Sequence, residues 1–166
     1  MIKLFFFLLA SGLTTAWCQT SDDYFKIADR KYNSGDYHGA IKEYDKAIGL
    51  NPVYAEAYCH RGNSKSKLGD YEGAVQEYNK AISINPQYAE AYLDRGNAKS
   101  GKGDNKGAIQ EYNKAIGINP RYAEAYYDRG SAKNSDGDRK GACSDWSKAG
   151  ELGFRKAFDL IKKNCK

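Results

Sequence analysis

The feature that most constrains the fold is a motif that returns every 34 residues along the chain. The stretches NPVYAEAYCHRGNSK, NPQYAEAYLDRGNAK and NPRYAEAYYDRGSAK begin at Asn51, Asn85 and Asn119. Such a period is typical of solenoids, in which each unit buries its apolar face against the next. It divides most of the chain into four units: 21–54, 55–88, 89–122 and 123–156.

Each unit predicts a pair of antiparallel helices. In the second unit, Tyr58 and Gly62 have helical spacing until Gly69, which can end a helix in the left-handed conformation. Asp70 can then cap the next helix by accepting a backbone hydrogen bond, and Pro86 ends that helix. The apolar stripe of this second helix consists of Ala74, Val75, Tyr78, Ala81 and Ile82.

The repeated unit resembles the tetratricopeptide repeat (TPR) family. The resemblance is carried by Tyr58, Gly62, Gly69, Tyr71, Ala74, Tyr78, Ala81 and Pro86, and by most of their counterparts 34 residues away. It implies an all-α fold, a right-handed superhelical solenoid of four helical hairpins over 21–156. The first helix of each hairpin would line a concave groove for partner peptides. Residues 154–166 predict a further helix that caps the C-terminal edge of the core.

Two cations in each of the last three units depart from the family pattern, in which leucine and often tyrosine occupy their places. These cations are Arg61, Lys65, Arg95, Lys99, Arg129 and Lys133. A glutamate recurs one unit before each arginine, which predicts ion pairs across the hairpin boundaries. The predicted pairs are Glu43–Arg61, Glu77–Arg95 and Glu111–Arg129. The alternative is that these side chains are independent solvated charges.

The resemblance also implies which residues line the groove. They are Phe25, Lys26, Asp29, Glu56, Cys59, His60, Asn63, Glu90, Leu93, Asp94, Asn97, Glu124, Tyr127, Asp128 and Ser131. Some family members grip a peptide carboxylate with lysine and arginine, but the matching places here hold His60, Asp94 and Asp128. We therefore expect an extended partner with basic and apolar residues. Alternatively, Glu56, Glu90 and Glu124 only complement helix dipoles.

The first 18 residues have the layout of a secretory signal peptide, with one lysine and an apolar run from Leu4 to Ala10. The run is too short to cross a bilayer, which takes about 20 residues. Cleavage after Cys18 is expected. Lipid modification of Cys18 is the disfavoured alternative, because Trp17 is bulky. The mature protein is then exported, to the periplasm of a bacterium or beyond, and has no membrane span.

The last unit replaces the repeat pattern with cysteine and tryptophan. Trp146 takes the place of Tyr78 and Tyr112, and Cys143 and Cys165 lie equally far from the expected turn near Gly153. Antiparallel helices would bring these cysteines together, so we predict a disulfide, which an exported protein can form. Two buried free thiols are the alternative. Cys59 would be left unpaired on the groove face.

Composition and motifs argue against several other functions. The net charge of +5 is mild and disfavours a nucleic-acid binder. His38 and His60 have no metal-ligand spacing, and no catalytic motif stands out, so no metal, cofactor or enzyme activity is expected. The leading function is a non-catalytic scaffold or adaptor of the cell envelope. A chaperone for client segments and a small-molecule or glycan receptor that uses Phe25 and Tyr127 are the alternatives.

Overall fold

The structure is a computed structural model that describes residues 19–165. Over this range it has nine helices and no strands. Four hairpins come first: α1 (Ser21–Asn33) with α2 (Tyr37–Leu50), α3 (Ala55–Lys67) with α4 (Tyr71–Ile84), α5 (Ala89–Gly101) with α6 (Asn105–Ile118), and α7 (Ala123–Ser135) with α8 (Arg139–Glu151). The short helix α9 (Ala157–Asn164) follows.

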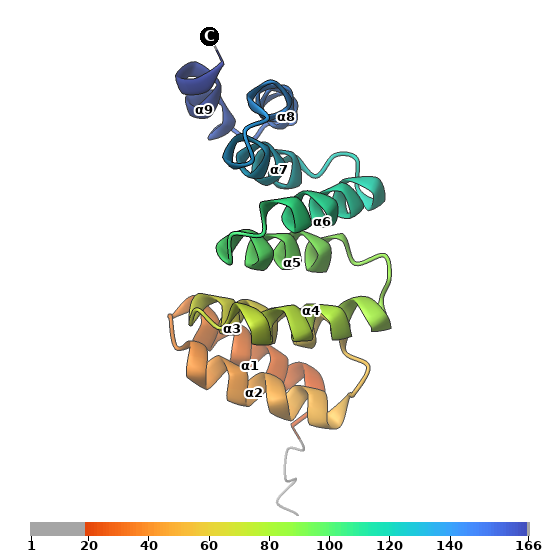
Figure 1. Ribbon diagram of the computed structural model, residues 1–166. Helices are drawn as coiled ribbons and strands as arrows, with labels where there is room; N and C mark the ends of the chain where they lie inside the picture. Colours follow the sequence, from red (N-terminus) through yellow and green to blue (C-terminus); the bar gives the residue numbers. More distant parts are fainter. Residues whose placement is uncertain (1–18, 166) are drawn as a thin grey trace, which may run out of the picture.

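The hairpins stack in sequence order from the lower to the upper end of the molecule, and α9 lies at the upper end (Figure 1). Each helix packs against its neighbours in the chain, and the first helices α1, α3, α5 and α7 also touch one another in turn. This arrangement confirms the predicted all-α solenoid.

Aspartates start the second helix of every hairpin. The Asp70 carboxylate accepts a hydrogen bond of 2.8 Å from the N–H of Gly73, and the other three hairpins repeat the contact. A Cβ atom at Gly73 would overlap the Asp70 carboxylate. Glycine in a first helical turn costs up to about 1 kcal/mol relative to alanine, and this cap explains why the cost is accepted.

A large aromatic side chain of each second helix fills the core of its hairpin. These residues are Tyr44, Tyr78, Tyr112 and Trp146, and all are at most 2% exposed. They lie against a glycine of the first helix: a Cβ at Gly96 would stand only 2.5 Å from Cε1 of Tyr112. Because glycine is the only residue that leaves this space, the two helices can approach closely.

The C-terminal cap folds back across the last hairpin. Gly153, at φ 94°, makes the turn, and the Phe154 ring then packs 4.8 Å from the Tyr127 ring. Cys143 of α8 and Cys165 after α9 form a disulfide, with Cα atoms 5.7 Å apart. The pairing is the one that the antiparallel register predicts. The helix itself begins at Ala157, slightly later than expected.

The predicted signal peptide and Cys18 lie outside the described residues. Among the helices of residues 19–165, none is both long and apolar enough to cross a bilayer.

Candidate functional site

Two hollows lie on the face formed by the first helices. The first has a volume of about 320 Å³ and is lined by Asp29, Tyr32, Asn33, Tyr44, His60, Asn63 and Glu90. The second has a volume of about 470 Å³ and is lined by Tyr32, Asn63, Ser66, Lys67, Tyr71, Tyr78, Asp94, Asn97 and Glu124. Tyr32 and Asn63 line both, so the hollows adjoin. We call the two together the concave site.

Seven of the predicted groove residues line the concave site: Asp29, His60, Asn63, Glu90, Asp94, Asn97 and Glu124. The prediction missed Tyr32, Asn33, Ser66, Lys67 and Tyr71. Tyr32 and Ser66 follow Asp29 and Asn63 by three residues, which is one helical turn. The helical period could therefore have extended the groove by a turn.

Buried tyrosines hold the polar side chains of this site in place. Tyr78 donates a hydrogen bond of 2.6 Å to Oδ1 of Asn63, and Tyr112 donates one of 2.8 Å to Oδ1 of Asn97. The amide NH₂ groups are then free to donate, and they hydrogen-bond the carboxylates of Asp94 and Asp128. The core of one hairpin thus orients the groove carboxylate of the next hairpin.

These carboxylates have unusual protonation equilibria. Burial raises the pKa of Asp94 to about 6, although the hydrogen bond from Asn63 opposes the change. Burial, followed by repulsion from Glu124 and Asp94, raises the pKa of Asp128 to about 7. Such shifts mean that the ionised groups lack compensating positive charge.

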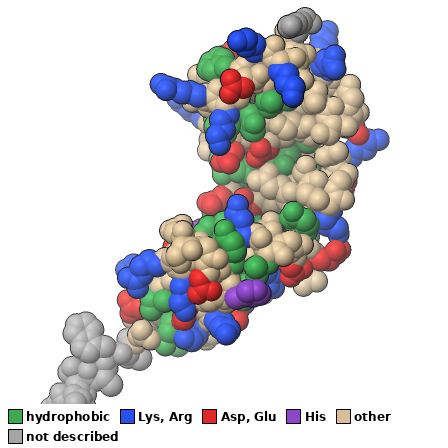
Figure 2. All heavy atoms as spheres, turned by 90° about the vertical axis from the view of Figure 1, so that its left-hand side faces the viewer, with side chains coloured by type: hydrophobic (Ala, Val, Ile, Leu, Met, Phe, Trp, Pro, Cys, Tyr) green, Lys and Arg blue, Asp and Glu red, His purple; other side chains and the backbone are tan. Residues whose placement is uncertain are grey.

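No described cation forms an ion pair with Glu90, Asp94, Glu124 or Asp128; the ion pairs among residues 19–165 involve other acids. Figure 2 shows acidic side chains gathered where the surface is hollowed midway along the molecule. The concave site is therefore an acidic surface that its own chain leaves unneutralised. The glutamates also lie in the first turns of α3, α5 and α7, which have no side-chain cap, so a dipole role coexists with the groove role.

The N-terminal boundary of the site has different chemistry. His60 occupies the place of Asp94, and its Nδ1 lies 2.9 Å from Oδ1 of Asp29. Its ring also packs 5.1 Å from the Phe25 ring. The acidic character of the groove therefore rises from the first hairpin toward the fourth.

Four predicted groove residues instead pack between hairpins. Cys59 is fully buried, with its Sγ 3.6 Å from Oδ2 of Asp94, and Leu93 is 2% exposed. Phe25 stacks on Tyr54 at 5.0 Å, and Tyr127 packs on the cap. The expected side-chain pocket at Leu93 and the expected groove thiol at Cys59 are wrong, because the following hairpin covers this edge of each first helix. Burial also raises the pKa of the Cys59 thiol.

The remaining predicted residues lie around the concave site and do not line its hollows. Lys26 and Glu56 are exposed, and Ser131 donates a hydrogen bond of 3.0 Å to the Tyr127 carbonyl. Asp128 lies beside Asn97 at the C-terminal end of the site.

The predicted ion pairs between hairpins are wrong in their partners. Arg95 reaches Glu111 of its own hairpin at 2.6 Å, and its other terminal nitrogen reaches Asn79 of the preceding hairpin at 2.6 Å. Arg61 and Arg129 repeat this pattern, with Glu77 and Asp45 and with Asp145 and Asn113. The arginine thus crosses the boundary two residues beyond the expected glutamate, because the helices of one hairpin pack closest together.

The lysine that replaces the family's tyrosine completes the network. Lys99 lies 2.7 Å from Glu111, and Glu43 of the first hairpin binds Lys31 at 2.7 Å and Lys46 at 2.8 Å. Although burial alone would raise the pKa of Glu111, hydrogen bonds from Lys99 and Arg95 hold it below its ordinary value. The 12-residue spacing of lysine and acid in every unit was the available signal.

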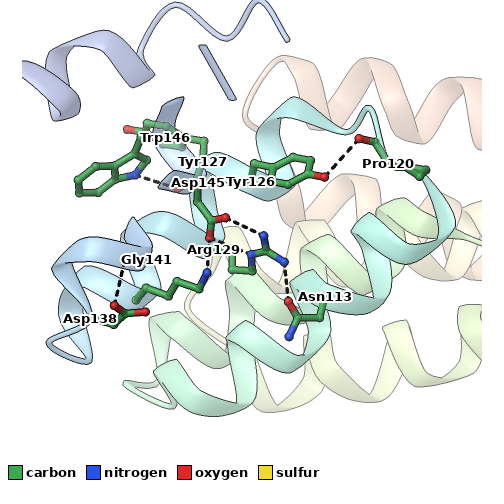
Figure 3. A network of polar contacts seen from close by, with 10 residues as sticks. Asn113, Pro120, Tyr126, Tyr127, Arg129, Asp138, Gly141, Asp145 and Trp146 are labelled. Atoms are coloured by element: carbon green, nitrogen blue, oxygen red, sulfur yellow. Dashed lines mark hydrogen bonds and ion pairs between the residues drawn. The ribbon is translucent and has the colours of Figure 1, made fainter. Parts of the chain in front are cut away.

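The last hairpin makes the tightest version of this contact, as Figure 3 shows for Arg129 between Asn113 and Asp145. Two nitrogens of Arg129 donate to Asp145, Nε at 2.8 Å and Nη2 at 2.6 Å. In the described chain, the buried Nε atoms of Arg61 and Arg95 have no hydrogen-bond partner. The shorter aspartate allows the bidentate geometry.

The described residues bring no three His, Cys, Asp or Glu side chains together as a metal site requires. A stack of helical hairpins with a hollowed concave face defines a class of solenoid proteins, the protein-interaction modules. A family model described as TPR repeat matches residues 28–69, 62–103 and 101–137. The chain therefore belongs to the tetratricopeptide repeat family, a fold that is typically a non-catalytic scaffold.

Solved structures give the same result. The crystal structure of MamA is 29% identical, covers 82% of this chain and 80% of that chain, and has a TM-score of 0.74. TTC0263, a TPR protein of Thermus thermophilus, is 23% identical with a TM-score of 0.76, over 87% of this chain and 82% of that chain. The first TPR of Spaghetti (RPAP3), bound to the HSP90 peptide SRMEEVD, is 21% identical with a TM-score of 0.68, over 70% and 93%. No curated protein matches the sequence.

Proposed function

We propose that the concave site binds an extended partner segment that carries lysine or arginine side chains, and that the protein acts as a scaffold or adaptor. The observation that carries the proposal is the row of carboxylates without cationic partners, in which the pKa values of Asp94 and Asp128 are raised to about 6 and about 7. A cation from a partner would stabilise both ionised groups at once. The fixed amides of Asn63 and Asn97 keep the carboxylates in position.

The polar lining distinguishes this proposal from a receptor for apolar or glycan ligands. Phe25 and Tyr127, the aromatic residues that such a receptor would use, pack against Tyr54 and Phe154. Tyr32 is the aromatic side chain that lines both hollows, and it can stack on a guanidinium group. Arginine-containing segments are therefore favoured.

A selection from a library of random 12-residue peptides on the purified protein tests the proposal. The expected outcome is enrichment of lysine and arginine in the bound peptides. Neutralising Asp94→Asn together with Asp128→Asn should weaken the best peptide at least about tenfold. Asp136→Asn, an exposed aspartate beyond the end of α7, is the matched control and should change nothing. Enrichment of acidic peptides would contradict the proposal.

The same selection separates a scaffold from a chaperone. A scaffold yields one dominant peptide family with slow dissociation, whereas a chaperone for client segments yields many unrelated sequences with similar weak affinities. The well-fixed side chains of the concave site support the first outcome, since adaptable surfaces are typical of promiscuous binders.

We also propose that the protein is exported, to the periplasm or beyond the cell. The disulfide between Cys143 and Cys165 supports this location, because disulfides persist in oxidising compartments. The intact mass of the protein purified from its native host tests it. Loss of residues 1–18 and of two hydrogens is expected, whereas an added lipid mass would indicate modified Cys18. A full-length, reduced chain would contradict export.

A further inference from the structure

The positive charge of the chain is concentrated at one end. Residues 139–166 contain eight Lys and Arg against three Asp and Glu, which equals the whole chain's net charge of +5. Residues 1–138 contain equal numbers of the two kinds and are neutral. Figure 2 shows Lys and Arg side chains spread over the upper end of the molecule, where Figure 1 places α8 and α9.

Six of these cations are exposed: Arg139, Lys140, Arg155, Lys156, Lys162 and Lys163. None forms an ion pair with a described residue, although Lys148 of the same hairpin pairs with Glu151 at 3.1 Å. We call the six residues the basic end. They contrast with Arg61, Arg95 and Arg129, whose charges are all neutralised inside the repeats.

The cap brings the six cations together. Arg139 and Lys140 begin α8, and they line one hollow with Asn164 and Cys165 at the end of α9. The disulfide therefore holds the start of α8 beside the lysines that end α9. Asp159 is the one exposed acid of α9, so the surface stays strongly positive.

An exposed aromatic ring lies within this surface. Phe158 is 57% exposed, although one side of its ring rests against Gly150 of α8. Lys162 follows Phe158 by one helical turn on α9. Cations around an exposed apolar side chain are the features that place helices at the surface of a bilayer.

We infer that the basic end docks on anionic lipid bilayers, with Phe158 entering the headgroup region. Flexible, exposed cations without a shaped pocket suit a fluid anionic surface better than a folded acidic partner, which would require fixed pairing. Each cation near such a surface strengthens binding about fivefold. The inference is independent of the concave site, which faces a different partner.

Sedimentation of the purified protein with vesicles tests the inference. Vesicles of phosphatidylcholine with about 30% phosphatidylglycerol should bind the protein at low salt and release it at about 0.5 M NaCl, where charges are screened within about 4 Å. Pure phosphatidylcholine vesicles should bind little. Equal binding to both kinds of vesicle, or none to either, would overturn the inference.

Variants locate the contact. Lys162→Glu with Lys163→Glu should lower partitioning at least about 25-fold, and Phe158→Ser should lower it several-fold. Lys42→Glu with Lys106→Glu reverses the same number of exposed charges on α2 and α6 and should have little effect; an equal loss in this control contradicts docking through the basic end. A salt-sensitive dimer seen by sedimentation without lipid, and lost in Lys162→Glu with Lys163→Glu, would instead assign the basic end to the acidic groove of a second copy.

Discussion

The inner hairpins and the terminal hairpin share one set of contacts and differ in another. Both have the network of arginine, lysine and acid: Arg95 and Lys99 bind Glu111, and Arg129 and Lys133 bind Asp145. Only the inner hairpins connect their core to the groove, since Tyr112 donates to Asn97 whereas Trp146 donates to the backbone carbonyl of Tyr127 at 3.2 Å.

The difference separates stacking from binding. The charge network recurs wherever a hairpin follows another, so it belongs to stacking. The link from tyrosine to amide to carboxylate stops where the groove stops, so it belongs to binding. In the last hairpin the disulfide and α9 replace that link, and the unit ends the solenoid instead of extending the groove.

The largest expected effect comes from breaking the shared network. Glu111→Ala leaves Arg95 and Lys99 without their buried acceptor and should lower the free energy of unfolding by about 3–5 kcal/mol. Asp145→Ala should cost a similar amount, if the network has the same role in both regions. Denaturant unfolding at pH 7 measures both. Asp45→Ala, at the exposed end of the network, should cost less than about 1 kcal/mol; a small loss in all three would contradict the stacking role.

Removal of the disulfide should affect the terminal region alone. Cys143→Ser with Cys165→Ser should lower stability by about 3 kcal/mol, because the closed loop spans 22 residues. Hydrogen exchange should speed up in α7 to α9 and stay unchanged in α3 to α6. Dithiothreitol acting on the wild type is the matched control and should reproduce the result. Faster exchange throughout the chain would show that the cap supports every hairpin.

Neutralising the groove acids should stabilise the inner region. The pKa values of Asp94 and Asp128 in the folded state, about 6 and about 7, lie above the ordinary 3.8. The folded state therefore binds more protons between these limits, and stability falls as pH rises from about 4 to 7. Asp94→Asn and Asp128→Asn should each add roughly 1–2 kcal/mol at pH 8, after allowance for solvent screening, and nothing below pH 4. Thermal unfolding at both pH values tests the sign, and destabilisation at pH 8 would refute it.

The smallest effect isolates the link between core and groove. Tyr112→Phe removes the hydroxyl that holds Asn97 and should cost about 1 kcal/mol of stability. It should also weaken the selected peptide several-fold, because Asn97 is then free to turn away. Trp146→Phe, its counterpart in the last hairpin, should reduce stability but leave peptide affinity unchanged. Equal affinities in the two variants would break the distinction between the regions.

The sequence predicts the fold through its period, since a 34-residue repeat of glycine, aspartate and small residues has few solutions. It also predicts the disulfide, because antiparallel helices fix which residues face each other across a turn. Both inferences need only the geometry within one hairpin.

The site was less predictable because it depends on how neighbouring hairpins stack. Cys59 and Leu93 share a helical face with His60 and Asp94 in the sequence, but the next hairpin covers the first pair and leaves the second on the concave side. The ion-pair partners of the arginines depend on the same stacking. Burial at Asp94 and Asp128, which raises their pKa values, cannot be read from one helix at a time.

The most direct test of the central claim is a carboxyl NMR titration of Asp94 and Asp128, in the free protein and with the tightest peptide from the selection. We expect pKa values near 6 and near 7 in the free protein. Both should fall by at least about one unit when the peptide binds, since a partner cation favours the ionised forms. Unchanged pKa values in a saturated complex would show that the partner does not meet these carboxylates, and would contradict the proposed binding site.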